Sequence, residues 1–137
     1  MARVESRARA RALQALYAWD VRGREGLERV AVQTWDDLRV GPEERRIASQ
    51  LVNVIVEQGR DVDRELADLT TNWRLERLGA IERCVLRLAA AELRRGETPP
   101  KVVIQEAVHL AERYGSAQSA KFVNGIVDAL ARRLGRL

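Results

Sequence analysis

Cysteine, histidine and proline are scarce in this 137-residue sequence, and each scarcity excludes a class of protein. The single cysteine, Cys84, cannot form an internal disulfide, and no group of cysteines and histidines has the spacing of a zinc site. The single histidine, His109, belongs to no Ser/His/Asp set, and no glycine-rich phosphate loop is present. We therefore expect no catalytic residues, no cofactor and no metal. Proline occurs only at Pro42, Pro99 and Pro100, which leaves long stretches free for helices.

Long apolar runs are also absent. No run reaches the length of about 18 residues that a membrane-spanning helix needs, and the N-terminus has no apolar segment of a signal peptide. The sequence therefore predicts a cytoplasmic protein with a single domain over residues 1–137. Its net charge is only +4, but 22 of its 24 basic residues are arginines. Arginine suits bidentate contact with phosphate, although a general preference for arginine would explain the total.

Apolar residues recur at helical spacing along the chain, and no segment alternates with the period of a strand. The pattern predicts an all-α fold, a compact bundle of six to seven helices in which two three-helix units share a core. Ser119 is the expected cap of the last helix. The expected helices cover about residues 6–21, 27–38, 42–58, 61–70, 79–95, 98–114 and 119–134.

Arginines gather at the start of the first expected helix. Arg7, Arg9 and Arg11 alternate with alanines, and Arg3 precedes them. Positive charge at a helix N-terminus opposes the macrodipole and destabilises the helix. Such a departure from local preference favours a functional role, and RNA phosphates would relieve the repulsion. In the same helix, Tyr17 lies at the rim of the apolar stripe, where its hydroxyl group can reach solvent or a ligand.

Two later expected helices carry polar residues whose positions suggest a partner or a ligand. In residues 79–95, Glu92 falls on the apolar face, so we expect it to be paired with an arginine or a helix start. Glu82 and Arg87 lie off that face and are expected to be free to contact a partner. In the last helix, Lys121, Phe122, Asn124 and an outward-facing glycine at 125 suit a base stacked on a ring with a phosphate nearby. Ordinary core packing of Phe122 is the alternative explanation.

Four stretches carry a family resemblance. They are RARARALQALYAWD at 7–20, IERCVLRLAAAEL at 81–93, PPKVVIQEAVHLAERYG at 99–115 and KFVNGIVDALA at 121–131. In this order they resemble an arginine-rich start with A-x-Q-A-L-Y-x-W, a helix with R-[LI]-A-x-x-E-L, a P-x-K-V-x-I-x-E-A helix and the motif K-F-V-N-G-[VI]-L-D. Together they resemble the NusB family of bacterial transcription antitermination factors over essentially the whole chain.

The resemblance implies a non-enzymatic, all-helical protein that binds the boxA element of ribosomal RNA leader transcripts. The implied partners are ribosomal protein S10 (NusE) and the RNA polymerase antitermination complex with other Nus factors. The implied RNA-binding residues include Arg7, Arg9, Tyr17, Glu82, Arg87 and Phe122, while the role of Arg11 rests on its charge alone. With the residues proposed from local chemistry, the full candidate set is Arg3, Arg7, Arg9, Arg11, Tyr17, Glu82, Arg87, Lys121, Phe122 and Asn124.

Two alternatives remain open at this point. A ribosomal RNA methyltransferase can carry a NusB-like domain before its catalytic domain, but this chain has neither an S-adenosylmethionine-binding α/β domain nor a catalytic cysteine motif. A structural scaffold that forms a homodimer is the second alternative, because some members of the family dimerise and hide the RNA surface. The sequence does not locate the surface that would contact ribosomal protein S10, for which the region around the fourth and fifth expected helices is a candidate.

Overall fold

The computed structural model describes residues 3–70 and 75–137, and these residues form only helices and their connections. The six α-helices are α1 (Val4–Val21), α2 (Leu27–Asp37), α3 (Pro42–Leu69), α4 (Ala80–Arg95), α5 (Pro100–Tyr114) and α6 (Ala117–Arg133). A short 3-10 helix, η1 (Leu75–Arg77), precedes α4. The prediction of an all-α bundle is therefore confirmed. None of the helices in the described ranges is long and apolar enough to cross a membrane.

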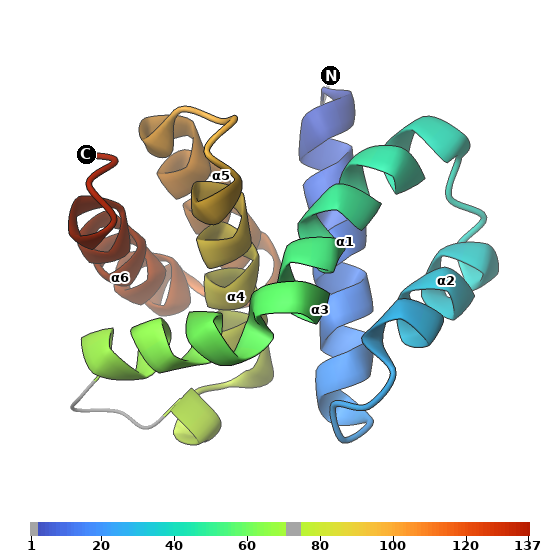
Figure 1. Cartoon of the computed structure of the whole chain (residues 1–137), viewed down its shortest axis with the longest axis horizontal. Coiled ribbons are helices and arrows are strands. Elements are labelled where there is room, and N and C mark those ends of the chain that lie inside the picture. Colours follow the sequence, from blue (N-terminus) through green and yellow to red (C-terminus); the bar gives the residue numbers. More distant parts are fainter. Residues whose placement is uncertain (1–2, 71–74) are drawn as a thin grey trace.

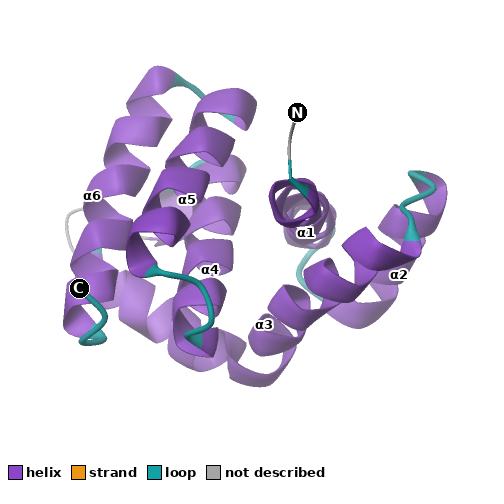
Figure 2. Ribbon diagram, turned by 90° about the horizontal axis from the view of Figure 1, so that it is seen from above, coloured by secondary structure: helices purple, strands orange, loops and turns teal. Residues whose placement is uncertain are grey.

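The helices form two groups that α3 joins. α4, α5 and α6 lie together on one side of the molecule, α1 and α2 lie on the other, and α3 runs across both groups (Figure 1). Seen along its axis, α1 lies between the α4–α6 group and α2 (Figure 2). α1 packs against α2, α3 and α4, so together with α3 it joins the two groups into one core.

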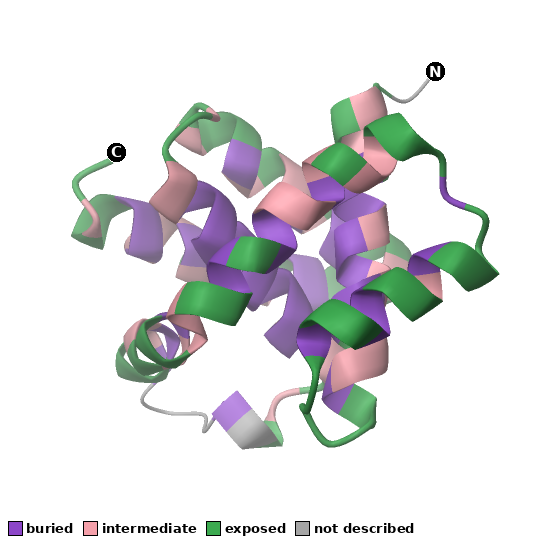
Figure 3. Cartoon of the chain, turned by 45° about the vertical axis from the view of Figure 1, so that its right-hand side comes forward, coloured by how far each residue is buried: buried purple, intermediate pink, exposed green. Residues whose placement is uncertain are grey.

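α4 is the most deeply buried helix. All its residues from 83 to 93 are buried. The buried residues of the chain gather in the middle of the molecule, and exposed residues lie on the outer faces of the helices (Figure 3). Small residues make close packing possible here, because Ala8, Ala12 and Ala15 of α1 and the alanines at 89–91 of α4 are all buried. Cys84 also belongs to the core, as predicted, and burial raises the pKa of its thiol to about 12.

Two predicted helix boundaries are wrong. The segments 42–58 and 61–70 form one helix, α3, which bends at Gln58 (φ −123°, ψ 15°) but does not end there. The amide oxygen of Gln58 accepts a hydrogen bond from Nη1 of Arg94 at 2.8 Å, which holds the bend against α4. The last helix begins earlier than expected, because Ser116 is its N-cap and accepts a hydrogen bond from the backbone N–H of Ser119. The loop predicted at 71–78 lies partly outside the described residues, and its part at 75–77 is η1.

Glu92 has the partner that its position on the apolar face requires. Arg9 of α1 donates from Nε to Oε1 of Glu92 at 2.8 Å and from Nη2 to Oε2 at 2.6 Å. Thr98 donates its hydroxyl hydrogen to Oε2 at 2.7 Å. Nη1 of Arg9 reaches Glu106 of α5 at 3.1 Å, and Glu106 also accepts from Ser6. The predicted tether of Glu92 is thus confirmed, and it joins α1, α4 and α5.

Replacing Glu92 by Gln should destabilise the protein strongly. The change leaves the guanidinium of Arg9, which is 7% exposed, without its main counter-ion. Breaking a buried ion pair in this way costs about 3–5 kcal/mol in the free energy of unfolding. Urea denaturation measures this loss. The control is Asp128→Asn, which breaks an exposed pair with Arg132 and should cost less than about 1 kcal/mol. Equal losses in the two variants would contradict the structural role of Glu92.

Candidate nucleic-acid interface

Helix geometry divides the arginines of the chain start between two faces of α1. Each residue of an α-helix is rotated by about 100° about the helix axis from the one before it. Arg9 is therefore rotated by about 200° from both Arg7 and Arg11 and lies on nearly the opposite face of α1. Arg3, Arg7 and Arg11 follow one another at intervals of four and form one line along the helix. We call these three residues the arginine stripe. Arg3 and Arg7 are exposed, and Arg11 is half-buried.

Arg9 does not lie on the exposed surface with the other arginines. Its guanidinium is enclosed by Glu92 and Glu106 between α1, α4 and α5. Burial alone would lower the pKa of Arg9, but the hydrogen bonds and charge of Glu92 outweigh burial and raise it. The expectation that Arg9 belongs to the group of arginines that contacts RNA phosphates is therefore corrected. Its charge is already neutralised inside the protein, and it holds the stripe-bearing helix in place.

Arg87 is also buried, which corrects the expectation that it is free to contact a partner. Its side chain is 1% exposed, because α3 and the end of α1 cover the face of α4 on which it lies. Nη1 donates to Oδ1 of Asp20 at 2.9 Å, and Nε donates to Oδ1 of Asp63 at 2.9 Å. The guanidinium also lies over the ring of Trp19, 5.4 Å from its centroid. Arg87 thus fastens α1, α3 and α4 to one another.

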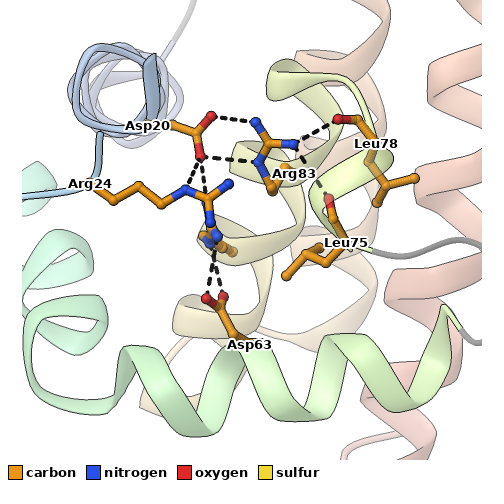
Figure 4. A network of polar contacts seen from close by, with 7 residues as sticks. Asp20, Arg24, Asp63, Leu75, Leu78 and Arg83 are labelled. Atoms are coloured by element: carbon orange, nitrogen blue, oxygen red, sulfur yellow. Dashed lines mark hydrogen bonds and ion pairs between the residues drawn. The ribbon is translucent and has the colours of Figure 1, made fainter. Parts of the chain in front are cut away.

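Asp20 is the centre of this second buried network (Figure 4). In addition to Arg87, Arg83 donates to both of its carboxylate oxygens, at 3.0 and 2.5 Å, and Arg24 donates at 3.0 Å. Burial alone would raise the pKa of Asp20, but the hydrogen bonds and charges of these arginines lower it to about 2. Sequence reasoning missed this network, because an acidic residue at a helix end, such as Asp20, does not by itself indicate a buried ion pair.

The remaining candidates meet at a pocket between α4 and α6. A shallow pocket of about 250 Å³ opens there, and we call it the α4–α6 pocket. The hydroxyl of Ser119 donates to Oε1 of Glu82 at 3.0 Å, which joins the first turns of the two helices. Glu82 was expected to be free to contact a partner, but it is half-buried and one of its oxygens is already hydrogen-bonded. The lining residues are Leu78, Glu82, Ser116, Gln118, Ser119 and Phe122.

The other predicted residues lie on α6 and near the end of α1. Lys121 and Asn124 are exposed on α6, and Phe122 is half-buried, so its ring both packs against the core and reaches the pocket. Tyr17 is 41% exposed near the end of α1, one turn before Asp20, which contacts α4 beside Glu82. A Cβ atom at Gly125 would meet nothing of this chain within 4 Å, so packing inside the protein does not require this glycine.

Sequence reasoning also missed Glu44, which stands in the first turn of α3. Its carboxylate accepts from Nε of Arg7 at 3.4 Å and from Nε of Arg11 at 3.2 Å. It therefore lies against two of the three residues of the arginine stripe. Glu44 is 37 residues from Arg7 and 33 residues from Arg11 in the sequence, and no sequence pattern predicts these contacts between different helices. Within the described ranges, no group of three or more acidic, cysteine or histidine side chains could hold a metal ion.

Comparisons with known proteins agree on one family. The model of the NusB family matches residues 6–132. The transcription antitermination protein NusB of Anaeromyxobacter dehalogenans is 44% identical over 132 residues, which cover 94% of this chain and 91% of that protein. NusB of Sorangium cellulosum is 43% identical over 133 residues, which cover 96% of this chain and 94% of that protein.

Solved structures of NusB proteins have the same fold. T. maritima NusB superimposes with a TM-score of 0.86 at 33% identity, and the match covers 96% of this chain and 93% of that one. A second match is a structure of the antitermination factors NusB and NusE in complex with double-stranded RNA. Its matching chain gives a TM-score of 0.87 at 29% identity and covers 97% of this chain and 99% of that one.

Acid should remove the contribution of Asp20 to stability. Its pKa in the folded protein, about 2, lies below the ordinary value of 3.8. The carboxylate therefore contributes about 2 kcal/mol to the free energy of unfolding above about pH 4, and this contribution is lost as the pH falls towards 2. Urea denaturation of wild type and Asp20→Asn at pH 7, 4, 3 and 2.5 should show a gap that narrows with falling pH. A gap that stays constant would contradict the charge state assigned to Asp20.

Proposed function

This chain belongs to the NusB family of transcription antitermination proteins, and we propose that it binds boxA-type single-stranded RNA of ribosomal RNA leader transcripts together with ribosomal protein S10 (NusE). Through that complex it would support processive transcription of ribosomal RNA. Family membership places it among antitermination factors, which are not enzymes, and the curated relatives described above bear that name. The methyltransferase alternative has no support from these relatives.

The observation that carries the proposal is the arginine stripe, which presents cations along one line of a rigid helix. Arg3, Arg7 and Arg11 are not buried, whereas Arg9 and Arg87 are withdrawn into the protein. Phosphates spaced along a strand would meet these cations and release counterions on binding. The stripe would supply affinity without reading sequence, as phosphate contacts do in general.

The α4–α6 pocket supplies the features that would read a base. Phe122 offers a ring face for stacking, and Glu82 offers a carboxylate that can accept a hydrogen bond from a base amine. Lys121 and Asn124 add a cation and an amide on the exposed side of α6. Tyr17 adds an exposed aromatic ring near the end of α1. Phosphate contact and base reading are thus assigned to separate surfaces of one domain.

The span from Arg3 to Tyr17 sets the length of RNA that could lie along α1. Tyr17 is 14 positions after Arg3, the N-cap of α1, which corresponds to about 21 Å along the helix axis. At the duplex spacing of about 3.4 Å per nucleotide this span holds about six nucleotides, and fewer if the strand is extended. A short single-stranded element is therefore sufficient to reach from the arginine stripe to Tyr17.

The partners and the cellular setting complete the proposal. The solved relative that contains both NusB and NusE with RNA supports ribosomal protein S10 as the direct protein partner of this chain. RNA polymerase and further Nus factors would join the resulting complex. We propose that residues 1–137 act as one RNA-binding domain in the cytoplasm. Size-exclusion chromatography with and without RNA would distinguish a monomeric binder from a homodimer that covers the RNA surface.

Removing two residues of the stripe should weaken RNA binding and reduce its salt dependence. The test is a fluorescence titration of Arg7→Ala/Arg11→Ala with a boxA-like single-stranded RNA and a duplex of the same sequence, with and without S10. We expect at least about tenfold weaker binding of the single strand and a log–log salt slope shallower by about 1.4, or 0.7 for each lost phosphate contact. Arg9 is left unchanged because its replacement would leave Glu92 buried without its partner and destabilise the protein.

The matched control for this titration is Arg132→Ala/Arg133→Ala. It removes the same charge from arginines that also pair with carboxylates, but at the far end of α6. Its effect on affinity should stay below about threefold, as expected for charges outside the contact surface. Equal losses in the two double variants would show that net charge, and not the stripe, drives RNA binding. Failure of the wild type to bind either RNA, even with S10, would refute the proposed function.

Replacing Phe122 should weaken binding by removal of a stacking surface. Loss of one base–aromatic stack costs about 1–3 kcal/mol, or roughly fivefold to 150-fold in Kd. Phe122→Leu is the suitable change because it keeps apolar contact with the core while it removes the ring. Its salt slope should equal that of the wild type, since no phosphate contact is lost. An unchanged Kd in a variant that melts at the wild-type temperature would contradict the stacking role.

A further inference from the structure

We propose that Glu44 acts as a built-in counter-ion that occupies the place of an RNA phosphate on the arginine stripe of the free protein. RNA must displace it or bind beside it, so Glu44 lowers the affinity of the protein for RNA. This inference rests on the proposed function and names a residue that sets its strength. Glu44 lies outside the four stretches that carry the family resemblance and outside the candidate RNA-binding set.

The contacts of Glu44 resemble those of a bridging phosphate. One carboxylate oxygen, Oε2, faces Nε of Arg7 at 3.4 Å, and the other, Oε1, faces Nε of Arg11 at 3.2 Å. The two arginines lie one helical turn apart, so their guanidinium groups flank a single anion. A phosphate bridges two guanidinium groups in the same way, with one oxygen for each. The carboxylate is therefore seated where the stripe would hold one phosphate of an RNA strand.

The start of α3 makes this seat more positive. Glu44 lies in the first turn of α3, where the partial positive charge of the helix dipole favours an anion. The N-cap of α3 is Gly41, which provides no side-chain hydrogen bond to the free backbone N–H groups. Three sources of positive potential, namely Arg7, Arg11 and the N-terminus of α3, thus converge on one anionic group. An RNA phosphate would be attracted by the same three sources.

Competition should outweigh any benefit from holding the arginines in position. The side chains of Arg7, Arg11 and Glu44 are 45%, 31% and 19% exposed, so their ion pairs are screened by water. Exposed pairs of this kind stabilise a geometry only weakly. A carboxylate within a few ångströms of an incoming phosphate, in contrast, repels it directly. Neutralising Glu44 should therefore strengthen RNA binding.

The chain offers a matched control in the neighbouring residue. Glu43 stands in the same turn of α3 and carries the same charge, but it is exposed and makes no ion pair with the described residues. Glu43→Gln and Glu44→Gln change the net charge equally and differ by one position. A difference between their effects reports the seat on the stripe, and not the total charge of the protein.

The experiment is a titration of the same fluorescent single-stranded RNA with wild type, Glu44→Gln and Glu43→Gln at several salt concentrations. We expect the Kd of Glu44→Gln to fall about threefold to tenfold and the Kd of Glu43→Gln to change less than about twofold. The log–log salt slope should be steeper for Glu44→Gln, because solvent ions then cover the stripe in place of the carboxylate. In the Arg7→Ala/Arg11→Ala background, Glu44→Gln should have no effect beyond that of Glu43→Gln.

The outcomes separate this inference from the proposed function. If the wild type binds RNA and the two glutamine variants shift its affinity equally, the role of Glu44 is refuted while the proposed function stands. Weaker binding by Glu44→Gln would refute it as well, because Glu44 would then hold the arginines in position. If neither wild type nor Glu44→Gln binds RNA, both ideas fall. A thermal melt of each variant verifies that all of them are folded.

Discussion

The packing of α1 against α4 depends on buried arginine–carboxylate pairs at both ends of the contact. Near the start of α1, Arg9 donates to Glu92, and near its end, Asp20 accepts from Arg83. The charges are reciprocal, since α1 supplies the cation at one end and the anion at the other. A shift of one residue would separate both pairs and leave buried charges without partners, at a cost of several kcal/mol each. The pairs therefore fix the register of these helices more strictly than the alanine packing between them.

This register decides which arginines can serve a ligand. With Arg9 held toward α4 and α5, the opposite side of α1 must carry Arg7 and Arg11, because the helical period allows no other arrangement. In the alternating run at the start of the chain, Arg9 is thus a buried structural cation, and Arg7 and Arg11 on either side of it in the sequence are accessible. The positive end of the α1 dipole repels the arginines at the start of the helix. The carboxylates of Glu44, Glu92 and Glu106, which pair with these arginines, reduce this repulsion. Binding of RNA is not needed to make the helix stable.

Predictions from sequence were sound where one helix contains the information. The periodicity of apolar residues located the helices, and the place of Glu92 on an apolar face required a partner, which proved to be Arg9. Predictions failed where a second helix decides the outcome. Arg87 lies off the main apolar stripe of α4, but α1 and α3 cover that face too, and α3 continues through the bend at Gln58 because α4 supports it there. Glu44 meets the stripe only through the tertiary fold.

The rigidity of this frame bears on how the two candidate surfaces would work together. Asp20 and Arg83 join the end of α1 to the start of α4, and Ser119 joins the start of α6 to Glu82 beside it. The α4–α6 pocket is therefore fixed relative to α1, and through α1 to the arginine stripe. An RNA strand that binds both surfaces therefore bears most of the loss of conformational entropy, since the protein has little to rearrange. Side-chain release, such as that of Arg7 and Arg11 from Glu44, is then the main adjustment left to the protein, which makes a single carboxylate sufficient to tune binding.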